Sequence, residues 1–274
     1  PSVTFFLMTV AATIYTNLDT VMLGFMTNSA QVGYYNAAVK MKNILASIVG
    51  ALGAVLLPRV SFYVEKGMHR EYKKTLEKSL KVVLLIALPL MTYCMLEAKD
   101  VLLFLSGKQY LPALSAMVVI MPTILLIGMS NITGMQILVP QGLEKYTIIS
   151  TVVGAILDLF LNTALIPKYG ALGASIGTLV AEMSVLSVQV YFLRKSPYIH
   201  IIDKDYLKIL IVLMVAIFGM MISMKLIISR IVFIRLMSSS VIFFGLYFVG
   251  LLMVKEDIIE EHGIGIITKL LKKK

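Results

Sequence analysis

The sequence contains no tryptophan and one cysteine, Cys94, and charged residues make up only 15% of the chain. A single cysteine excludes a disulfide within the chain and a metal site built from several thiolates. Without tryptophan, tyrosines such as Tyr34 and Tyr35 are the aromatic residues expected at a membrane surface. So few charges, with 59% hydrophobic residues and a mean hydropathy of +0.91, cannot cover a soluble protein of 274 residues. The composition therefore predicts a membrane-embedded protein.

The motifs of common enzymes and ATP-driven pumps are also absent. The sequence has no H-E-x-x-H, G-x-S-x-G, G-x-G-x-x-G or Walker-type G-K-[ST] motif. His69, His200 and His262 fall in predicted loops, and none has the spacing of metal ligands. We therefore expect no enzyme activity, no cofactor and no bound metal.

Long apolar runs fill the chain almost from end to end. A helix needs roughly 20 apolar residues to cross about 30 Å of hydrocarbon, so little chain remains for a soluble domain. We predict an all-α fold, a polytopic membrane helix bundle. The predicted spans are residues 3–26, 38–63, 80–97, 112–139, 146–166, 171–193, 207–228 and 232–254.

The net charge of +10 lies mainly between these spans, which indicates loop orientation and contact with anionic lipid rather than nucleic acid. If the chain enters the first span from the cytoplasm, the inside segments carry more than twice as many Lys and Arg residues as the outside segments. This asymmetry predicts that both ends are cytoplasmic. The chain starts at Pro1 without signal-peptide features, and we expect a fragment whose natural N-terminal half is missing.

Two basic stretches on the predicted cytoplasmic side have helical patterns. Residues 65–81 suit a helix lying on the membrane surface, and residues 255–274 form an amphipathic run that ends in three lysines. Either stretch could be a solvated basic face or a specific partner site.

Ionisable residues inside spans are the main functional signal, because a charge at mid-membrane costs about 2.5–3.5 kcal/mol. Asp19 lies in the first span on a helix with a threonine ridge that includes Thr16. Asp19 is either a residue that binds a neighbouring helix or a functional carboxylate. In the fifth span, Asp158 and Asn162 share one polar face, and Glu182 lies on a similar ridge in the sixth. Asp158 and Glu182 are therefore candidates for proton or cation handling.

The second span carries a polar stripe with Lys40, Asn43 and Ser47 at three-to-four spacing, and Arg59 marks its inner end. Both cations could extend to the nearer headgroups along their apolar stems. Lys40 faces the side of the polar stripe, which favours a functional role, whereas for Arg59 the headgroup interpretation is slightly favoured.

Residues 162–182, NTALIPKYGALGASIGTLVAE, resemble a stretch of the Wzx-type polysaccharide flippases, in the superfamily that includes the MATE antiporters. Residues 17–41, 56–61 and 136–146 resemble other stretches of that family in the same order. The matching residues of the first stretch are Asn162, Ile166, Pro167, Tyr169, Gly170, Gly173, Ala174 and Thr178.

The resemblance implies a MATE-like second six-helix bundle at residues 1–195, two additional transmembrane helices at 196–254 and a basic cytoplasmic tail at 255–274. It further implies translocation of undecaprenyl-diphosphate-linked oligosaccharide repeat units across a bacterial plasma (inner) membrane. The repeat units serve capsule, O-antigen or exopolysaccharide synthesis, and transport proceeds by alternating access. Expected partners are the lipid-linked oligosaccharide, membrane lipid, the missing N-terminal half and, as a further candidate, the polysaccharide polymerase machinery.

The resemblance also suggests roles for the polar residues. Lys40 and Arg59 would bind the diphosphate, and Thr16, Asn43, Ser47 and Asn162 would solvate the sugars. Asp19, Asp158 and Glu182 would exchange a proton or Na⁺. Two alternatives stay open: a MATE-type cation-coupled multidrug efflux antiporter and a peptidoglycan-precursor flippase.

Overall fold

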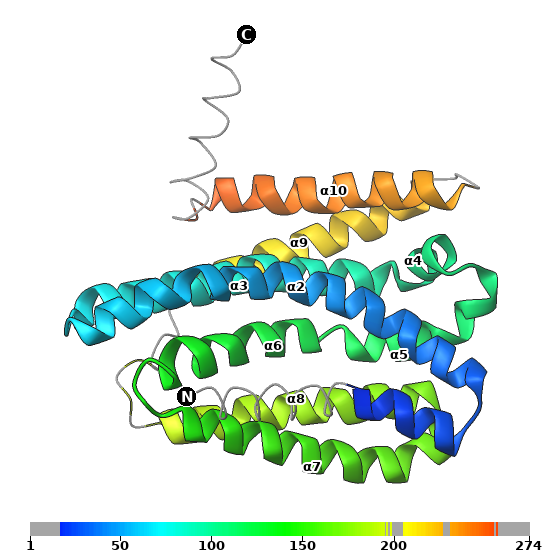
Figure 1. Ribbon diagram of the computed structural model, residues 1–274. Coiled ribbons are helices and arrows are strands. Elements are labelled where there is room, and N and C mark those ends of the chain that lie inside the picture. Colours follow the sequence, from blue (N-terminus) through cyan, green and yellow to red (C-terminus); the bar gives the residue numbers. More distant parts are fainter. Residues whose placement is uncertain are drawn as a thin grey trace.

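The structure, a computed structural model, describes residues 17–194, 196, 198, 205–226, 231–254 and 256. These residues form helices and short connections without a β-strand, as the apolar runs predict (Figure 1). Helices satisfy their backbone hydrogen bonds internally, which hydrocarbon requires of any segment that crosses it. After helical residues 17–26, the elements are α2 (Ser29–Glu65), α3 (His69–Leu96), α4 (Ala98–Leu105), η1 (Lys108–Ala113), α5 (Leu114–Ile120), α6 (Thr123–Asn131), η2 (Ile132–Leu138), α7 (Glu144–Tyr169), α8 (Ala171–Leu193), α9 (Asp205–Leu226) and α10 (Val232–Met253).

Seven stretches among the described residues are long and apolar enough to cross a membrane. They correspond to the second through eighth predicted spans. The first predicted span, residues 3–26, lies mostly outside the described residues, and only its end from residue 17 is described as helix. The second helix, α2, starts nine residues earlier than predicted, because Asn28 caps it by accepting a hydrogen bond from the Gln31 backbone N–H at 3.1 Å.

The prediction that residues 65–81 form a helix lying on the membrane surface is wrong. Helix α3 begins at His69 and continues without interruption into the membrane-spanning segment as far as Leu96. Tyr72 and Leu76 are buried in the bundle, so the amphipathic pattern reports helix packing rather than a helix lying on lipid. The other expected amphipathic stretch, residues 255–274, lies outside the described residues except for Glu256.

The predicted span at residues 112–139 is a chain of four shorter elements. It contains a 3₁₀ turn (η1), two α-helices separated near Pro122, and a π-helix (η2). Proline lacks a backbone N–H and crowds the preceding turn, which explains the break between α5 and α6. A π-helix widens the backbone by one residue per turn and is frequent at functional sites. Periodicity alone does not reveal such interruptions.

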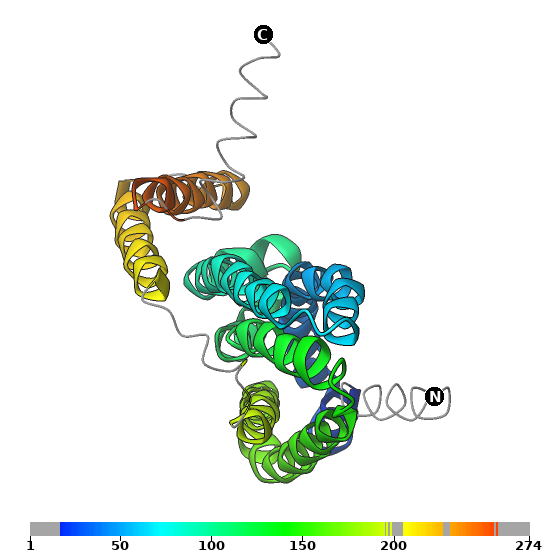
Figure 2. The ribbon, with the colours of Figure 1, turned by 90° about the vertical axis from the view of Figure 1, so that its left-hand side faces the viewer.

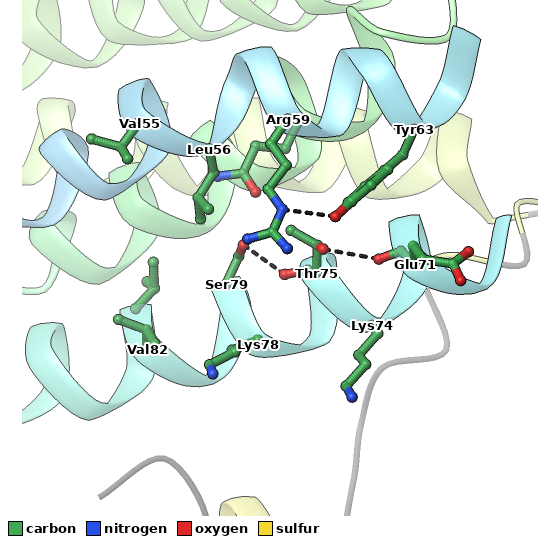
Figure 3. A pocket seen from close by; sticks show the side chains of 12 residues that line it. Val55, Leu56, Arg59, Tyr63, Glu71, Lys74, Thr75, Lys78, Ser79 and Val82 are labelled. Carbon is green, nitrogen blue, oxygen red and sulfur yellow. Dashed lines mark hydrogen bonds between the residues drawn. The ribbon is translucent and has the colours of Figure 1, made fainter. Parts of the chain in front are cut away.

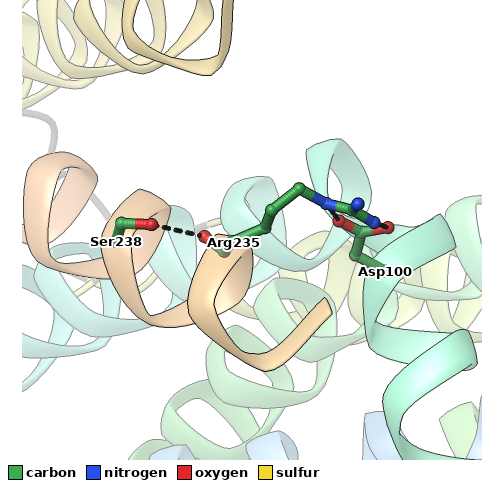
Figure 4. A network of polar contacts seen from close by, with 3 residues as sticks. All are labelled: Asp100, Arg235 and Ser238. Carbon is green, nitrogen blue, oxygen red and sulfur yellow. Dashed lines mark hydrogen bonds and ion pairs between the residues drawn. The ribbon is translucent and has the colours of Figure 1, made fainter. Parts of the chain in front are cut away.

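Helices α9 and α10 lie on the side of the bundle opposite α7 and α8 (Figures 1 and 2). Polar contacts fasten α10 to α3 and α4. The Tyr93 hydroxyl donates to the Leu236 carbonyl at 2.8 Å, and the Arg235 guanidinium donates two hydrogen bonds of 2.6 Å to the Asp100 carboxylate (Figure 4). Just beyond the opposite end of α10, Glu256 pairs with Lys81 of α3 at 2.6 Å. The α9–α10 pair is therefore attached by charge at both ends of α10.

The Arg235–Asp100 pair gives a stability test. Arg235→Ala should destabilise the protein by about 1–2 kcal/mol, because it leaves a largely buried carboxylate without its bidentate partner. The measurement is thermal unfolding in detergent. Ser238→Ala, which removes a hydroxyl that bonds only to its own helix, is the control on α10. An Asp100→Ala, Arg235→Ala double variant that loses the sum of the two single effects would contradict a direct coupling.

Candidate functional site

A buried polar cluster lies where residues 17–26, α2, α7 and α8 meet. The Asp19 carboxylate is 3% exposed and is the centre of the cluster. Asn162 of α7 donates from Nδ2 to Asp19 Oδ1 at 2.7 Å, and the Thr178 hydroxyl of α8 donates to Oδ2 at 2.9 Å. The Tyr35 hydroxyl of α2 also donates to Oδ2. One carboxylate thus receives donors from three other helices.

Asp158 lies one helical turn before Asn162 on α7, and its carboxyl faces Asp19. Asp158 is 1% exposed, and its Oδ1 and the Asn162 Oδ1 have no hydrogen-bond partner among the described residues. Two neighbouring carboxyl groups in a low-dielectric interior cannot both stay ionised without a compensating charge. The cluster therefore has the oxygen atoms and the charge to hold a proton or a small hard cation.

Lys42 of α2 lies near this cluster, and Glu182 and Asp19 are its acidic neighbours. Glu182 of α8 is half-buried. Lys42 balances part of the negative charge of Asp19, Asp158 and Glu182, so the cluster retains an excess of carboxylates. Within the described part of the chain, no three His, Cys, Asp or Glu side chains gather closely enough for a metal site built from those residues.

Close packing of α7 against α8 holds the cluster together. A Cβ added at Gly177 would lie 3.0 Å from Asp158 Oδ1 and nearer still to Asn162 Oδ1. A Cβ at Gly173 would lie 2.6 Å from the Leu165 carbonyl. Small residues let the two backbones approach, and this approach places the Asp158 and Asn162 side chains directly against α8.

The polar residues of α2 have a different environment. Lys40, Asn43 and Ser47 are exposed, and so is Arg59. Lys40 and Arg59 are 19 residues apart, which corresponds to about 28 Å along a helix. They cannot contact one diphosphate at the same time. The last member of the expected substrate group, Thr16, lies outside the described residues.

A cavity of about 660 Å³ separates the C-terminal half of α2 from the N-terminal half of α3 (Figure 3). Arg59 extends from α2 into the space between the helices, and its Nε donates to the Tyr63 hydroxyl at 2.8 Å. The other lining residues come from α2, from α3 and from the π-helix. They are Val55, Leu56, Glu71, Lys74, Thr75, Lys78, Ser79, Val82, Val83 and Gln136.

The structure therefore brings together Asp19, Asp158 and Asn162, with Glu182 nearby across Lys42. It separates these residues from Arg59. The sequence interpretation missed Lys42, although an ionisable residue within a predicted span was a sufficient signal. The expectation that Tyr35 lies at a membrane surface is wrong, because Tyr35 is 2% exposed and bonded to Asp19 and Thr178.

The sequence is similar to that of several membrane proteins, among them a putative transporter and a probable flippase. A family described as "Polysaccharide biosynthesis protein" matches residues 2–115. An uncharacterized membrane protein of Methanocaldococcus jannaschii is 28% identical over 93% of this chain and 50% of its own length. A putative O-antigen transporter of Escherichia coli is 26% identical over 70% of this chain and 46% of its own. A probable flippase, AglR, of Haloferax volcanii is 25% identical over 64% of this chain and 37% of its own.

The fold also matches a solved structure, the lipid II flippase MurJ in an inward closed conformation. The TM-score is 0.77 with 16% sequence identity, over 91% of this chain and 52% of that chain. At this identity the match shows the arrangement of helices. The chain spans half or less of the length of the relatives given above.

The close approach at Gly177 predicts the effect of one methyl group. Gly177→Ala should destabilise the protein by about 1–3 kcal/mol, because the new Cβ would push against the Asn162 and Asp158 oxygens. Gly245→Ala on α10 is the matched control, since nothing lies within 4 Å of its added Cβ. Equal melting temperatures for the two variants in detergent would contradict the packing described here.

Proposed function

We propose that this chain, a Wzx-type flippase-like protein, forms one helical half of a transporter for lipid-linked oligosaccharides. The cargo is an oligosaccharide repeat unit on undecaprenyl diphosphate, and the membrane is the bacterial plasma membrane, with both ends of the chain cytoplasmic. The two bundles of the whole protein rock around a shared polar cavity and expose it to each side in turn. The reaction is movement of the lipid headgroup without a change in its bonds.

The observation that carries the proposal is the sequence similarity to proteins named as a putative O-antigen transporter, a probable flippase and a second Haloferax volcanii protein, a probable low-salt glycan biosynthesis flippase. This similarity covers 60–70% of the chain. The flippase-like arrangement of helices over 91% of the chain is consistent with the same class of transporter.

The exposed stripe of α2 supports a polar translocation path. Lys40, Asn43 and Ser47 lie on a membrane-crossing helix, yet their side chains are exposed in this chain. Charged and amide groups are costly in contact with lipid tails, so this face needs water or another part of the protein against it. A cavity shared with the other half of the transporter satisfies that need and supplies donors for sugar hydroxyls.

The separation of Lys40 and Arg59 suggests an order of events. Arg59 lies near the end of α2 that we assign to the cytoplasm, and Lys40 lies about 28 Å away, near the outer surface. A diphosphate made on the inner leaflet would meet Arg59 first and Lys40 after the cavity reopens outward. The lipid tail stays in the bilayer throughout.

Ion coupling is assigned to the buried cluster rather than to the exposed stripe. Protonation or Na⁺ binding at Asp19 and Asp158 would compensate their charge and tighten the contacts among α2, α7 and α8. Losing that ion would leave two unbalanced carboxylates and loosen the same contacts. Lys42 and Glu182 adjust the charge at the edge of the cluster. This arrangement links ion occupancy to helix packing.

The two alternative functions differ from the proposal in cargo. An efflux antiporter for organic cations needs an open acidic and aromatic pocket. The described cavity instead has three cationic side chains, Arg59, Lys74 and Lys78, against one carboxylate, Glu71, and the acidic cluster is packed by side chains from four helices. A peptidoglycan-precursor flippase would carry a similar diphosphate lipid, and only a transport assay with defined cargo separates it from the proposal.

Lys40→Ala and Arg59→Ala should each lower surface polysaccharide by about tenfold at matched protein levels, because each removes a charged contact to the diphosphate. Polysaccharide is measured by immunoblot in cells that depend on the whole protein. Lys168→Ala and Arg194→Ala are the matched controls, since both residues are exposed and lie outside the stripe and the cavity. Unchanged polysaccharide in both test variants would remove their assigned role.

Asp19→Asn and Asp158→Asn should abolish the dependence of transport on an ion gradient, because an amide binds neither an exchangeable proton nor a cation by charge. The measurement is translocation of a fluorescent lipid-linked oligosaccharide by the purified whole protein in vesicles, with imposed H⁺ or Na⁺ gradients. Native transport that ignores both gradients would refute the coupling while leaving the flippase proposal intact.

A further inference from the structure

We infer that the cavity between α2 and α3 binds the phosphate of a membrane lipid whose headgroup also carries hydroxyl groups. This chemistry is shared by lipid-linked sugars and by polyol phospholipids. The inference deepens the proposed function and rests on it in two respects. The proposed function supplies the orientation of α2 in the membrane and the reason to test a sugar-bearing lipid as the ligand. The evidence comes from the unsatisfied groups of the cavity wall, from its apolar portion and from its place at the helix ends.

Arg59 provides the binding group for phosphate. Its guanidinium has five N–H donors, and one of them is used by the Tyr63 hydroxyl. Across the described residues Arg59 forms no ion pair, although Glu71 also lines the cavity. The Tyr63 ring, 5.5 Å from the guanidinium carbon, holds the side chain in place without neutralising it. The remaining donors match the oxygens of a phosphate group, which arginine binds with two parallel hydrogen bonds.

One side-chain oxygen in the wall lacks a hydrogen-bond donor, and two hydroxyl oxygens have lone pairs left to accept one. Gln136 of the π-helix is 1% exposed, and its Oε1 has no hydrogen-bond partner in the described part of the chain. The Tyr72 hydroxyl fixes this residue by donating to its backbone carbonyl at 2.8 Å. Thr75 and Ser79 donate their hydroxyl protons to backbone carbonyls of α3 at 2.8 Å, which leaves their oxygen lone pairs available.

A ligand that satisfies these groups carries both an anion and hydroxyls. A buried amide oxygen without a donor costs about 1–3 kcal/mol, and a hydroxyl of the ligand would remove that cost. A bare phosphate would satisfy Arg59 but offers few protons to Gln136, Thr75 and Ser79. A polyol or sugar next to the phosphate satisfies both parts of the wall.

The rest of the wall is apolar, which indicates an amphiphile rather than a soluble anion. Val55, Leu56, Val82 and Val83 line the portion of the cavity farther along α2 and α3 from their connecting turn. That turn, residues 66–68, lies at the end of two membrane-crossing helices. A headgroup near Arg59 can therefore reach water at the turn while its lipid stem contacts the valines. A volume of about 660 Å³ fits a headgroup of this size.

The lysines of α3 have a secondary role. Lys74 and Lys78 contribute to the wall, but Figure 3 shows their ends pointing away from Arg59. Their positive charge favours the approach of anionic headgroups to this end of the bundle without contacting the bound phosphate. Arg59 and Gln136 are therefore the residues on which binding should depend.

The test measures lipid binding to the purified whole protein by native mass spectrometry in detergent. The probes are a polyprenyl diphosphate carrying one sugar, phosphatidylglycerol, phosphatidic acid without a headgroup hydroxyl, and inorganic pyrophosphate. We expect the two hydroxyl-bearing lipids to bind, phosphatidic acid to bind about tenfold more weakly, and pyrophosphate to bind weakest. The stronger of the two hydroxyl-bearing lipids identifies the source of the headgroup, and either result supports the shared chemistry.

Variants assign the binding to this cavity. Arg59→Ala should weaken lipid binding by about tenfold, and Arg59→Lys should recover part of it. Arg194→Ala is a closely matched control, because Arg194 also lies beside a tyrosine ring, that of Tyr191, at the end of a membrane-crossing helix. Gln136→Leu should remove the preference for hydroxyl-bearing lipids over phosphatidic acid. Melting temperatures of all variants identify any loss of folding.

Several outcomes would overturn the inference. These are equal binding in Arg59→Ala and Arg194→Ala, pyrophosphate binding as tight as that of the lipids, and an unchanged lipid preference in Gln136→Leu. A transport assay separates this failure from failure of the proposed function. Arg59→Ala that loses transport but keeps lipid binding refutes the cavity site and leaves the flippase proposal standing. Binding that depends on Arg59 in a protein that moves no lipid-linked oligosaccharide refutes the function and supports the site.

Discussion

The burial of the Asp19 carboxylate is the interaction on which the arrangement of this bundle depends. An ionised carboxylate inside a membrane protein is costly, and its cost falls only when donors or cations surround it. Asn162, Thr178 and Tyr35 donate to this one group from three different helices. Each helix must therefore keep its depth and rotation relative to the others. The glycines of α8 follow from the same requirement, because only small residues let α7 bring Asn162 and Asp158 close enough.

Helix α2 connects the two polar regions of the chain. Its first half contributes Tyr35 and Lys42 to the carboxylate cluster, and its second half contributes Arg59 to the cavity beside α3. The two regions differ in charge and in access: one is acidic and packed, and the other is basic and open. A small ion suits the first region and a large anionic headgroup suits the second. A continuous helix of 37 residues, with Pro58 in its second half, connects the two regions.

Much of the fold follows from the sequence, because about 20 apolar residues in a row have one stable arrangement in a bilayer. The all-α class, and the second through eighth spans to within several residues at most ends, could be predicted in this way. The sequence could not predict that residues 69–81 continue into the following span as one helix. An amphipathic pattern is the same whether the apolar face lies on lipid or against a protein neighbour. The sequence did not predict the π-helix either, because its extra residue per turn does not change the composition of the segment. Among polar residues, four-residue spacing on α7 correctly placed Asp158 and Asn162 on one face. No local sequence pattern, however, predicts the hydrogen bond between Tyr35 and Asp19. Nor does any pattern reveal that the side-chain amide oxygen of Gln136 lacks a partner among the described residues.

The attachment of α10 limits how the outer helices can move. If α10 were attached at one point only, the α9–α10 pair could rotate about that point. The Arg235–Asp100 pair at one end of α10 and the Lys81–Glu256 pair at the other fix the helix at two points, on α4 and on α3, so it cannot turn about a single contact. The α9–α10 pair is therefore expected to move together with α3 and α4, and it keeps many apolar side chains exposed on its surface.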